Sequence, residues 1–199
     1  KTEGAANFFS SLSLCGSNLE TAEARMGELL DVLREYHQDA FMFWLAPHHQ
    51  AVLSLLGKTE DPTKLQGTTI PSLEAFLESS RNNVQIETLV LVHSLPLQYQ
   101  FDATSSVAST LRKLGKVRLK EVLVHFDTYI LRLYMGLGHL KLYEETRKRT
   151  HLRNADRVIR TCSKLVSKGC ENMSATLNLL KAERHSQVYP NAKGTKTAD

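Results

Sequence analysis

The segment that most constrains the fold runs from 147 to 168 and reads RKRTHLRNADRVIRTCSKLVSK. It holds eight Lys and Arg residues and one acid, and apolar residues recur through it. With a step of about 100° per residue, as in an α-helix, the cations fall on one side and the apolar residues on the other. A β-strand would mix both kinds on each face. The segment therefore predicts an amphipathic helix with its apolar face against the protein core.

The cationic side of this helix is predicted to bind anions. It carries Arg149, Arg153, Arg157, Arg160, Lys164 and Lys168, and Arg147 and Lys148 extend the charge at the N-terminal end. The six span about 28 Å at ~1.5 Å per residue, and like charges at this spacing repel. Only Asp156 is close enough in sequence to relieve that repulsion. The alternative is a solvated face that Glu residues of other helices partly neutralise. We favour an anion-binding surface.

A second basic cluster lies in RKLGKVRLK at 112–120. It consists of Arg112, Lys113, Lys116, Arg118 and Lys120. Some of these charges are expected to be simply solvated, and the others to widen the anion-binding surface.

The kind of anion stays open at this stage. The apolar side of the 149–168 helix is Leu, Val, Ile, Ala and Cys, without the Trp or Phe of a membrane-inserting helix. Contact with an anionic membrane would therefore be peripheral and electrostatic. Apart from Asn154, the cationic side has no group suited to reading bases, so nucleic acid would be bound without sequence preference.

The rest of the chain predicts an all-α fold of about eight to ten helices in two packed subdomains. Strand signals are weak, and apolar residues recur at intervals of three and four over 19–33 and 119–140. Pro47 and Pro71 are placed in the first turns of helices, and Asp61-Pro62 in a short helical turn. The stretch VQIETLVLVHSL at 84–95 could be a strand. We assign it to a helix that Pro96 ends, because an isolated strand is not stable.

Charge divides the chain into two halves. Residues 1–100 hold 6 Lys and Arg against 12 Asp and Glu, a net −6, and residues 101–199 hold 19 against 9, a net +10. We predict an acidic helical subdomain over 1–95, a linker over 96–106, a basic helical subdomain over 107–188 and a flexible tail over 189–199. The opposite charges predict a homo-oligomer in which the acidic N-terminal half of one copy meets the basic C-terminal half of another.

No catalytic, cofactor or metal motif is specific in this sequence. GLGHLK at 136–141 lacks the third glycine and the preceding strand of a dinucleotide loop, so Gly136 and Gly138 are interpreted as packing glycines. His48 and His49 are adjacent and point to different helix faces. The three cysteines have no metal spacing and favour a reducing compartment. We expect no enzyme, cofactor, metal or transmembrane segment. A deep pocket with converging His and carboxylates would argue otherwise.

The layout of an acidic helical half, a short linker and a basic helical half with a row of Arg and Lys resembles the viral matrix proteins of orthomyxoviruses. This resemblance covers architecture only. It implies a layer-forming protein that bridges an anionic membrane and a ribonucleoprotein, with the row of cations as the contact surface.

The sequence thus predicts a non-enzymatic assembly protein that self-associates and binds an anionic membrane, RNA or ribonucleoprotein. The alternative is a helical scaffold domain of an intracellular complex that binds one acidic protein. The predicted location is the cytoplasm or nucleus, including the surface of a membrane or the inside of a virion, and not secretion.

Overall fold

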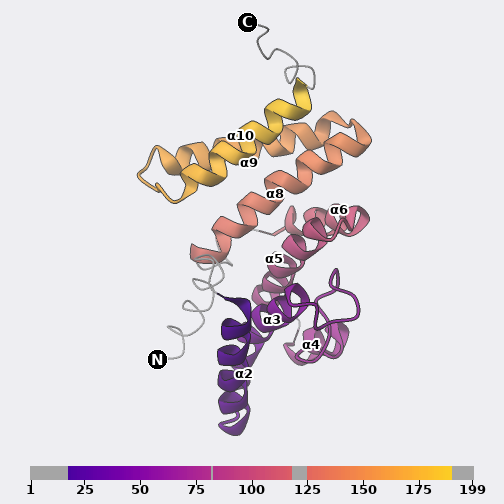
Figure 1. Ribbon diagram of the computed structural model, residues 1–199, viewed down its shortest axis with the longest axis vertical. Coiled ribbons are helices and arrows are strands. Elements are labelled where there is room, and N and C mark those ends of the chain that lie inside the picture. The colour runs from indigo at the N-terminus through magenta and orange to yellow at the C-terminus, as the bar shows by residue number, and fades with distance from the viewer. Residues whose placement is uncertain (1–17, 82, 118–124, 190–199) are drawn as a thin grey trace, which may run out of the picture. The chain divides into compact units, whose positions relative to one another are not determined.

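The computed structural model describes residues 18–81, 83–117 and 125–189, and within them the chain is helical without a β-strand (Figure 1). The helices are α2 (Leu19–Glu35), α3 (Asp39–Leu55), α4 (Leu73–Ser79), α5 (Val84–Gln100), α6 (Thr104–Leu114), α8 (His125–Thr146), α9 (Arg149–Val166) and α10 (Met173–Val188). This confirms the predicted all-α class and the predicted number of helices, and it shows that 84–95 is helical.

The chain forms two compact units, residues 1–130 and 131–199, so the division falls within α8. The predicted linker at 96–106 does not separate them. Helix α5 continues through Pro96 to Gln100, and after a turn with Asp102 at φ 57°, α6 packs back on α5. The basic cluster at 112–116 consequently belongs to the first unit. The predicted tail lies outside the described residues from 190 onward.

Two prolines lie inside helices, where the sequence predicted helix ends. Pro47 is in the middle of α3 and Pro96 is near the end of α5. An interior proline costs about 3 kcal/mol because it removes one backbone hydrogen bond and crowds the preceding turn. In α5 the residues on both sides, Leu95 and Leu97, are fully buried. Continuous burial of apolar side chains therefore outweighs the local penalty of the proline.

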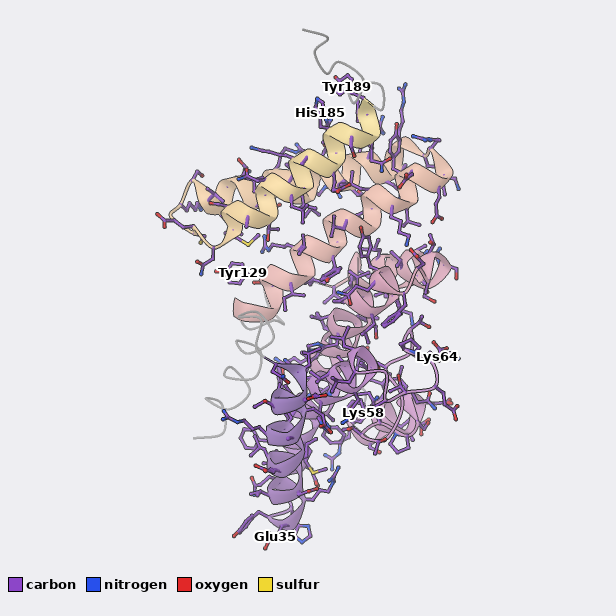
Figure 2. All side chains as sticks on the ribbon, in the orientation of Figure 1. Glu35, Lys58, Lys64, Tyr129, His185 and Tyr189 are labelled. Carbon is purple, nitrogen blue, oxygen red and sulfur yellow. The ribbon has the colours of Figure 1, made fainter. Side chains whose placement is uncertain are left out.

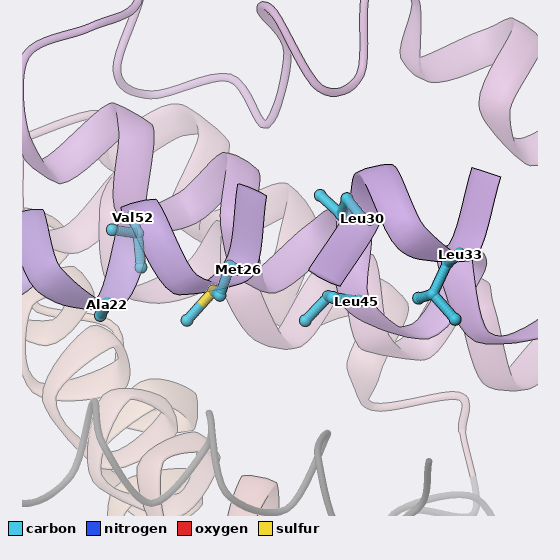
Figure 3. Packing of buried hydrophobic residues seen from close by; sticks show 6 residues of the cluster. All are labelled: Ala22, Met26, Leu30, Leu33, Leu45 and Val52. Carbon is cyan, nitrogen blue, oxygen red and sulfur yellow. The ribbon is translucent and has the colours of Figure 1, made fainter. Parts of the chain in front are cut away.

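The first unit is organised by the packing of α2 on α3. Asn18 caps α2, because its Oδ1 accepts the backbone N–H of Glu20 at 2.8 Å, and the helix ends at Glu35 (Figure 2). The buried side chains of this pair are Ala22, Met26, Leu30 and Leu33 of α2 with Leu45 and Val52 of α3 (Figure 3). Their spacing of three and four residues is the helical pattern that the sequence predicted.

A buried glutamine holds the connection between α3 and α4 against α3. Gln50 is fully buried, and its Oε1 accepts the backbone N–H groups of Thr69 and Ile70 at 3.0 and 3.1 Å. Asp61 begins an isolated turn and not the short helical turn that the sequence predicted. Its carboxylate accepts both the N–H and the hydroxyl of Thr63. The connection therefore follows side-chain hydrogen bonds instead of helical ones.

The second unit consists of the three helices α8, α9 and α10. Helices α9 and α10 lie side by side (Figure 1), and α8 contacts both of them. Its Gly136 faces Leu180 of α10, where an added Cβ would lie 2.5 Å from the leucine Cδ2. This contact agrees with the interpretation of Gly136 as a packing glycine. Gly169, at φ 91°, follows α9 as the sequence predicted, and Cys170 N–H donates to the carbonyl of Leu165.

We expect Gly136→Ala to lower the free energy of unfolding by about 1–3 kcal/mol, because the new methyl group overlaps Leu180 in a packed interface. Gly27→Ala is the matched control. A Cβ at Gly27 of α2 would find its nearest neighbour at 3.9 Å, so alanine should raise stability by up to about 1 kcal/mol through helix propensity. Thermal and urea denaturation show whether each variant is more or less stable than the native protein. Equal effects would contradict the proposed close contact.

Candidate anion-binding surface on helix α9

The rotation of α9 about its axis is set by its apolar side. Ala155, Ile159 and Cys162 are buried, and Ala155 and Cys162 are fully so. They lie on the unit's interior with the buried residues of α10, which are Met173, Leu177 and Leu180. The opposite side of α9 is therefore directed into solvent. This confirms the helix and the orientation that the sequence predicted for the segment.

The cations on that side form what we call the basic stripe: Arg149, Arg153, Arg157, Arg160, Lys164 and Lys168. All six are exposed, as are the flanking Arg147 and Lys148. The first five lie on α9 over about 22 Å at ~1.5 Å per residue, and Lys168 lies in the turn that follows. In the part of the chain that the structure describes, none of these eight cations makes an ion pair with a carboxylate.

The contacts that the stripe does make run along its own helix. The Arg157 guanidinium donates to Asn154 Oδ1 at 3.4 Å, and Arg160 Nε donates to the carbonyl of Asp156 at 3.3 Å. These contacts restrain the two arginine side chains but do not neutralise their positive charges. The repulsion between neighbouring cations thus remains in the free protein, and an external anion would relieve it.

Asp156 does not relieve the stripe, although its place in the sequence suggested that it would. Its carboxylate binds Arg184 of α10 through both oxygens, with Nε donating to Oδ1 and a guanidinium nitrogen donating to Oδ2 at 3.4 Å. The pair is about one third exposed and joins the two helices. Asp156 therefore forms its ion pair within its own unit. Its partner is 28 residues away in the sequence, so the spacing of charges along α9 could not reveal the pair.

The N-terminal end of α9 concentrates unfavourable positive charge. Its N-cap residue, Lys148, makes no side-chain capping bond, and the first turn has no acid. Arg147 precedes it in the left-handed region at φ 55°, and its guanidinium lies 5.9 Å from the centre of the Tyr143 ring. Cations at a helix N-terminus oppose the helix dipole, whereas an anion there is favoured.

The second basic cluster belongs to the other unit. Arg112, Lys113 and Lys116 are exposed at the C-terminal end of α6, where positive charge suits the helix dipole. Arg118 and Lys120 lie outside the described residues. The three described cations, unlike those at the N-terminal end of α9, therefore have a local electrostatic role at the end of their own helix.

A pair of histidines joins α8 to α9 beside the stripe. His139 is buried, and its Nδ1 lies 3.5 Å from Nδ1 of the half-buried His151. Burial lowers the pKa of His139 from 6.5 to about 4, and the nearby His151 and Arg157 act in the same direction. Burial, and then Lys148, also lowers the pKa of His151. At about 100° per residue His151 falls on the apolar side of α9, and this placement was the available signal for the contact.

A second polar cluster, which the sequence did not reveal, lies in the first unit. His49 Nδ1 is 2.7 Å from the hydroxyl of Thr69, and its Nε2 is 3.9 Å from a Glu23 carboxylate oxygen. Thr69 also borders a largely apolar cavity of about 330 Å³ between α2, α3 and α4, with Arg34 and Asp39 among its lining residues. Hydroxyl, imidazole and carboxylate thus follow one another, as in a nucleophilic site.

The surroundings of this cluster do not support nucleophilic catalysis. The backbone N–H groups of Thr69 and Ile70 donate to Gln50, so neither can stabilise an oxyanion. Glu23 binds Lys58 at 3.1 Å, and its 3.9 Å separation from His49 is too long for a hydrogen bond. Burial lowers the pKa of His49. The cluster is better understood as polar packing that joins α2, α3 and the connection after α3.

The other groups that could carry chemistry are dispersed. Within the described ranges, no three His, Cys, Asp or Glu side chains are grouped to hold a metal ion. Cys162 is buried, which raises the pKa of its thiol, and Cys170 is half-buried. Cys15 lies outside the described residues. Over the same described ranges, the helices include none with the length and apolar character needed to cross a membrane.

Comparisons with protein-family models, with curated proteins and with solved structures each found no match.

The buried His139 predicts a pH-dependent stability. In the unfolded chain it binds a proton near pH 6.5, but in the folded protein only near pH 4. The free energy of unfolding should therefore fall as the pH drops from about 6.5 to about 4, by up to about 3 kcal/mol, with no further contribution below that range.

Chemical denaturation of the native protein and of His139→Leu between pH 7.5 and 4 measures this effect. The variant should lose much of the dependence. The control is His185→Gln, because His185 is an exposed residue near the end of α10 (Figure 2). If His139→Leu and the native protein show the same dependence, the buried imidazole is not its source.

Proposed function

We propose that this protein is a non-enzymatic assembly protein that binds anionic surfaces through the basic stripe and self-associates. The observation that carries the proposal is the state of the stripe. Its six cations and the two that flank it are exposed and lack a carboxylate partner within the described chain, and Arg184 occupies the acid of the same helix. A surface with this many unpaired cations is suited to binding a partner that carries repeated negative charges.

The partner is RNA, a ribonucleoprotein or an anionic membrane surface, bound through phosphate groups. The apolar side of α9 is packed in the unit's interior, so membrane contact would be electrostatic rather than insertion. For single-stranded RNA, neutralising six to eight phosphates gives a slope of about −4 to −6 in log K against log salt concentration. The stripe has no aromatic group for stacking on bases, so affinity should depend little on sequence.

Self-association is proposed between opposite charges on two copies. On α2, Glu20, Glu28, Asp31 and Glu35 are exposed on the side opposite its buried residues, and Glu35 stands at the helix end (Figure 2). Only Asp31 among them makes an ion pair within the described chain, with Arg34 at 2.6 Å. Val32 of α2 and Tyr36, which follows the helix as its C-cap residue, are also exposed, at 47% and 65%. Exposed Tyr and apolar groups beside charges are typical of protein interfaces.

Reversing three charges of the stripe tests the binding surface. Arg153→Glu, Arg157→Glu and Arg160→Glu in one variant should weaken binding to single-stranded RNA and to anionic vesicles by two or more orders of magnitude at ~50 mM salt. Fluorescence anisotropy and vesicle sedimentation measure this, and circular dichroism checks the fold. The change leaves the Asp156–Arg184 pair and the buried side of α9 intact, so the fold should survive.

The control has the same net charge but leaves the stripe unchanged. It combines Lys64→Glu, Arg81→Glu and Lys181→Glu, which are exposed positions elsewhere in the chain. It should lose much less affinity than the stripe variant. Equal losses in both variants would mean that overall charge, and not the stripe, determines binding. One acidic protein partner with 1:1 stoichiometry, and no affinity for RNA or vesicles, would support the scaffold alternative instead.

A charge exchange tests the contact between copies. One variant carries Glu28→Lys, Asp31→Lys and Glu35→Lys on α2, and the other is the reversed stripe. Each alone should sediment as a smaller species than the native protein, because its two surfaces then carry the same sign. Their mixture should associate, because each pair of surfaces is again opposite in charge. A mixture that stays as dissociated as the separate variants would rule out this contact.

A further inference from the structure

Two hydroxyl side chains of this protein have an arginine three residues before them. They are Thr150, preceded by Arg147, and Ser163, preceded by Arg160. Both lie on α9 and both are exposed. A protein kinase with an acidic substrate groove selects acceptors with arginine at this spacing, because charge complementarity sets its specificity. The sequence alone does not separate the two acceptors, whereas the structure does.

Thr150 closely follows a short segment that belongs to no helix. Arg147 and Lys148 belong to no helix, and Arg147 takes a left-handed turn at φ 55°. Thr150 is the second residue of α9, in a first turn without a capping side chain or an acid. The three cations that precede it oppose the helix dipole, so this is the least favoured turn of the helix. It can open without displacing Arg147, Lys148 or Arg149 from any buried position, and the residue after Thr150, His151, is only half-buried in its contact with His139.

Ser163 lies in a part of α9 that cannot open so easily. The residue before it, Cys162, is fully buried, so an extended conformation around Ser163 would pull that side chain from the core. The C-terminal end is also closed by the Gly169 turn and the hydrogen bond from Cys170 N–H to Leu165. Lys164 and Lys168 there suit the helix dipole. A kinase would therefore meet Ser163 only after disruption of the unit.

We propose that Thr150 is a phosphorylation site and that its phosphate switches off the N-terminal part of the basic stripe. The kinase transfers the γ-phosphoryl group of ATP with Mg²⁺. The Thr150 hydroxyl oxygen forms a bond to the γ-phosphorus, the bond from that phosphorus to the ADP oxygen breaks, and the hydroxyl proton passes to a base of the kinase. The site itself rests on the geometry of α9, whereas its effect on binding rests on the proposed function.

The phosphate would be well accommodated on the folded helix. It carries about −1.5 to −2 charges at neutral pH, and it would stand at the first-turn N–H groups that lack a cap. Arg147, Arg149 and Arg153 lie within one turn of Thr150 in sequence, so the new charge pairs with cations that otherwise have no carboxylate partner. The modification therefore stabilises the start of α9 and occupies the cations that would bind an external anion.

The test uses the full chain, a purified kinase that selects arginine three residues before the acceptor, and ATP. Peptide mapping by mass spectrometry should place one phosphate on Thr150. Thr150→Val should abolish it, and Ser163→Ala should leave it unchanged. The phosphorylated protein should bind a single-stranded RNA oligonucleotide about tenfold more weakly at ~50 mM salt than the unmodified protein, with the salt slope reduced by about 1. Thr150→Glu should show a smaller loss in the same direction.

The outcomes separate the site from its effect. Phosphate on Ser163 or on several residues, or no phosphate at all, would overturn the assignment of Thr150. Phosphate on Thr150 without loss of RNA binding would overturn the switch, provided that the reversed-stripe variant does lose RNA binding. If the reversed-stripe variant also binds RNA normally, the proposed function fails, while the modification site stands on the mapping result.

Discussion

The packing of one side of α9 onto the interior of its unit is the constraint on which the candidate surface depends. Burial of Ala155, Ile159 and Cys162 fixes the rotation of the helix, and each cation lies on the side that this rotation leaves in solvent. A helix that rotated by a quarter turn would expose apolar side chains and bury arginines, which costs far more than it gains. The exposure of the cations that we propose bind anions is therefore a consequence of ordinary core packing, and it needs no dedicated loop or pocket.

Electrostatics then determines what this surface can do. The bond between Asp156 and Arg184 joins α9 to α10, and it removes from the stripe the acid that could have neutralised it. The pair is partly exposed, so its contribution to stability is modest, about 1 kcal/mol or less. Its larger effect is on charge, because the repulsion between the cations of the stripe is left without relief from the acid of the same helix. The proposed binding of a phosphate polymer, the proposed contact with a second copy and the proposed phosphorylation of Thr150 all depend on this same unpaired charge.

The sequence predicted the helices more reliably than their ends. The buried residues of α2 and α9 all lie on the apolar sides that the periodicity predicted, and Gly169 marked the end of α9. Pro47 and Pro96 lie inside helices rather than at the predicted helix ends, because the local preference for a helix end was weaker than the burial of the residues on both sides of each proline. The segment 96–106 contains the end of α5, a short turn and the start of α6. Asp102 can adopt the left-handed conformation that closes this turn, so polar residues there join two packed helices rather than two units.

By itself, the sequence determined the all-α class, the amphipathic character of α9 and the identity of its cations, because helical periodicity is a local property of the chain. Contacts between distant segments were decided only by the tertiary structure. It paired Asp156 with Arg184, brought His139 to His151, and placed His49 between Thr69 and Glu23. It also distinguished Thr150 from Ser163, since the burial of Cys162 depends on the helices that surround α9. The charge that a segment carries can be read from its residues, but whether that charge is neutralised depends on which side chains folding brings beside it.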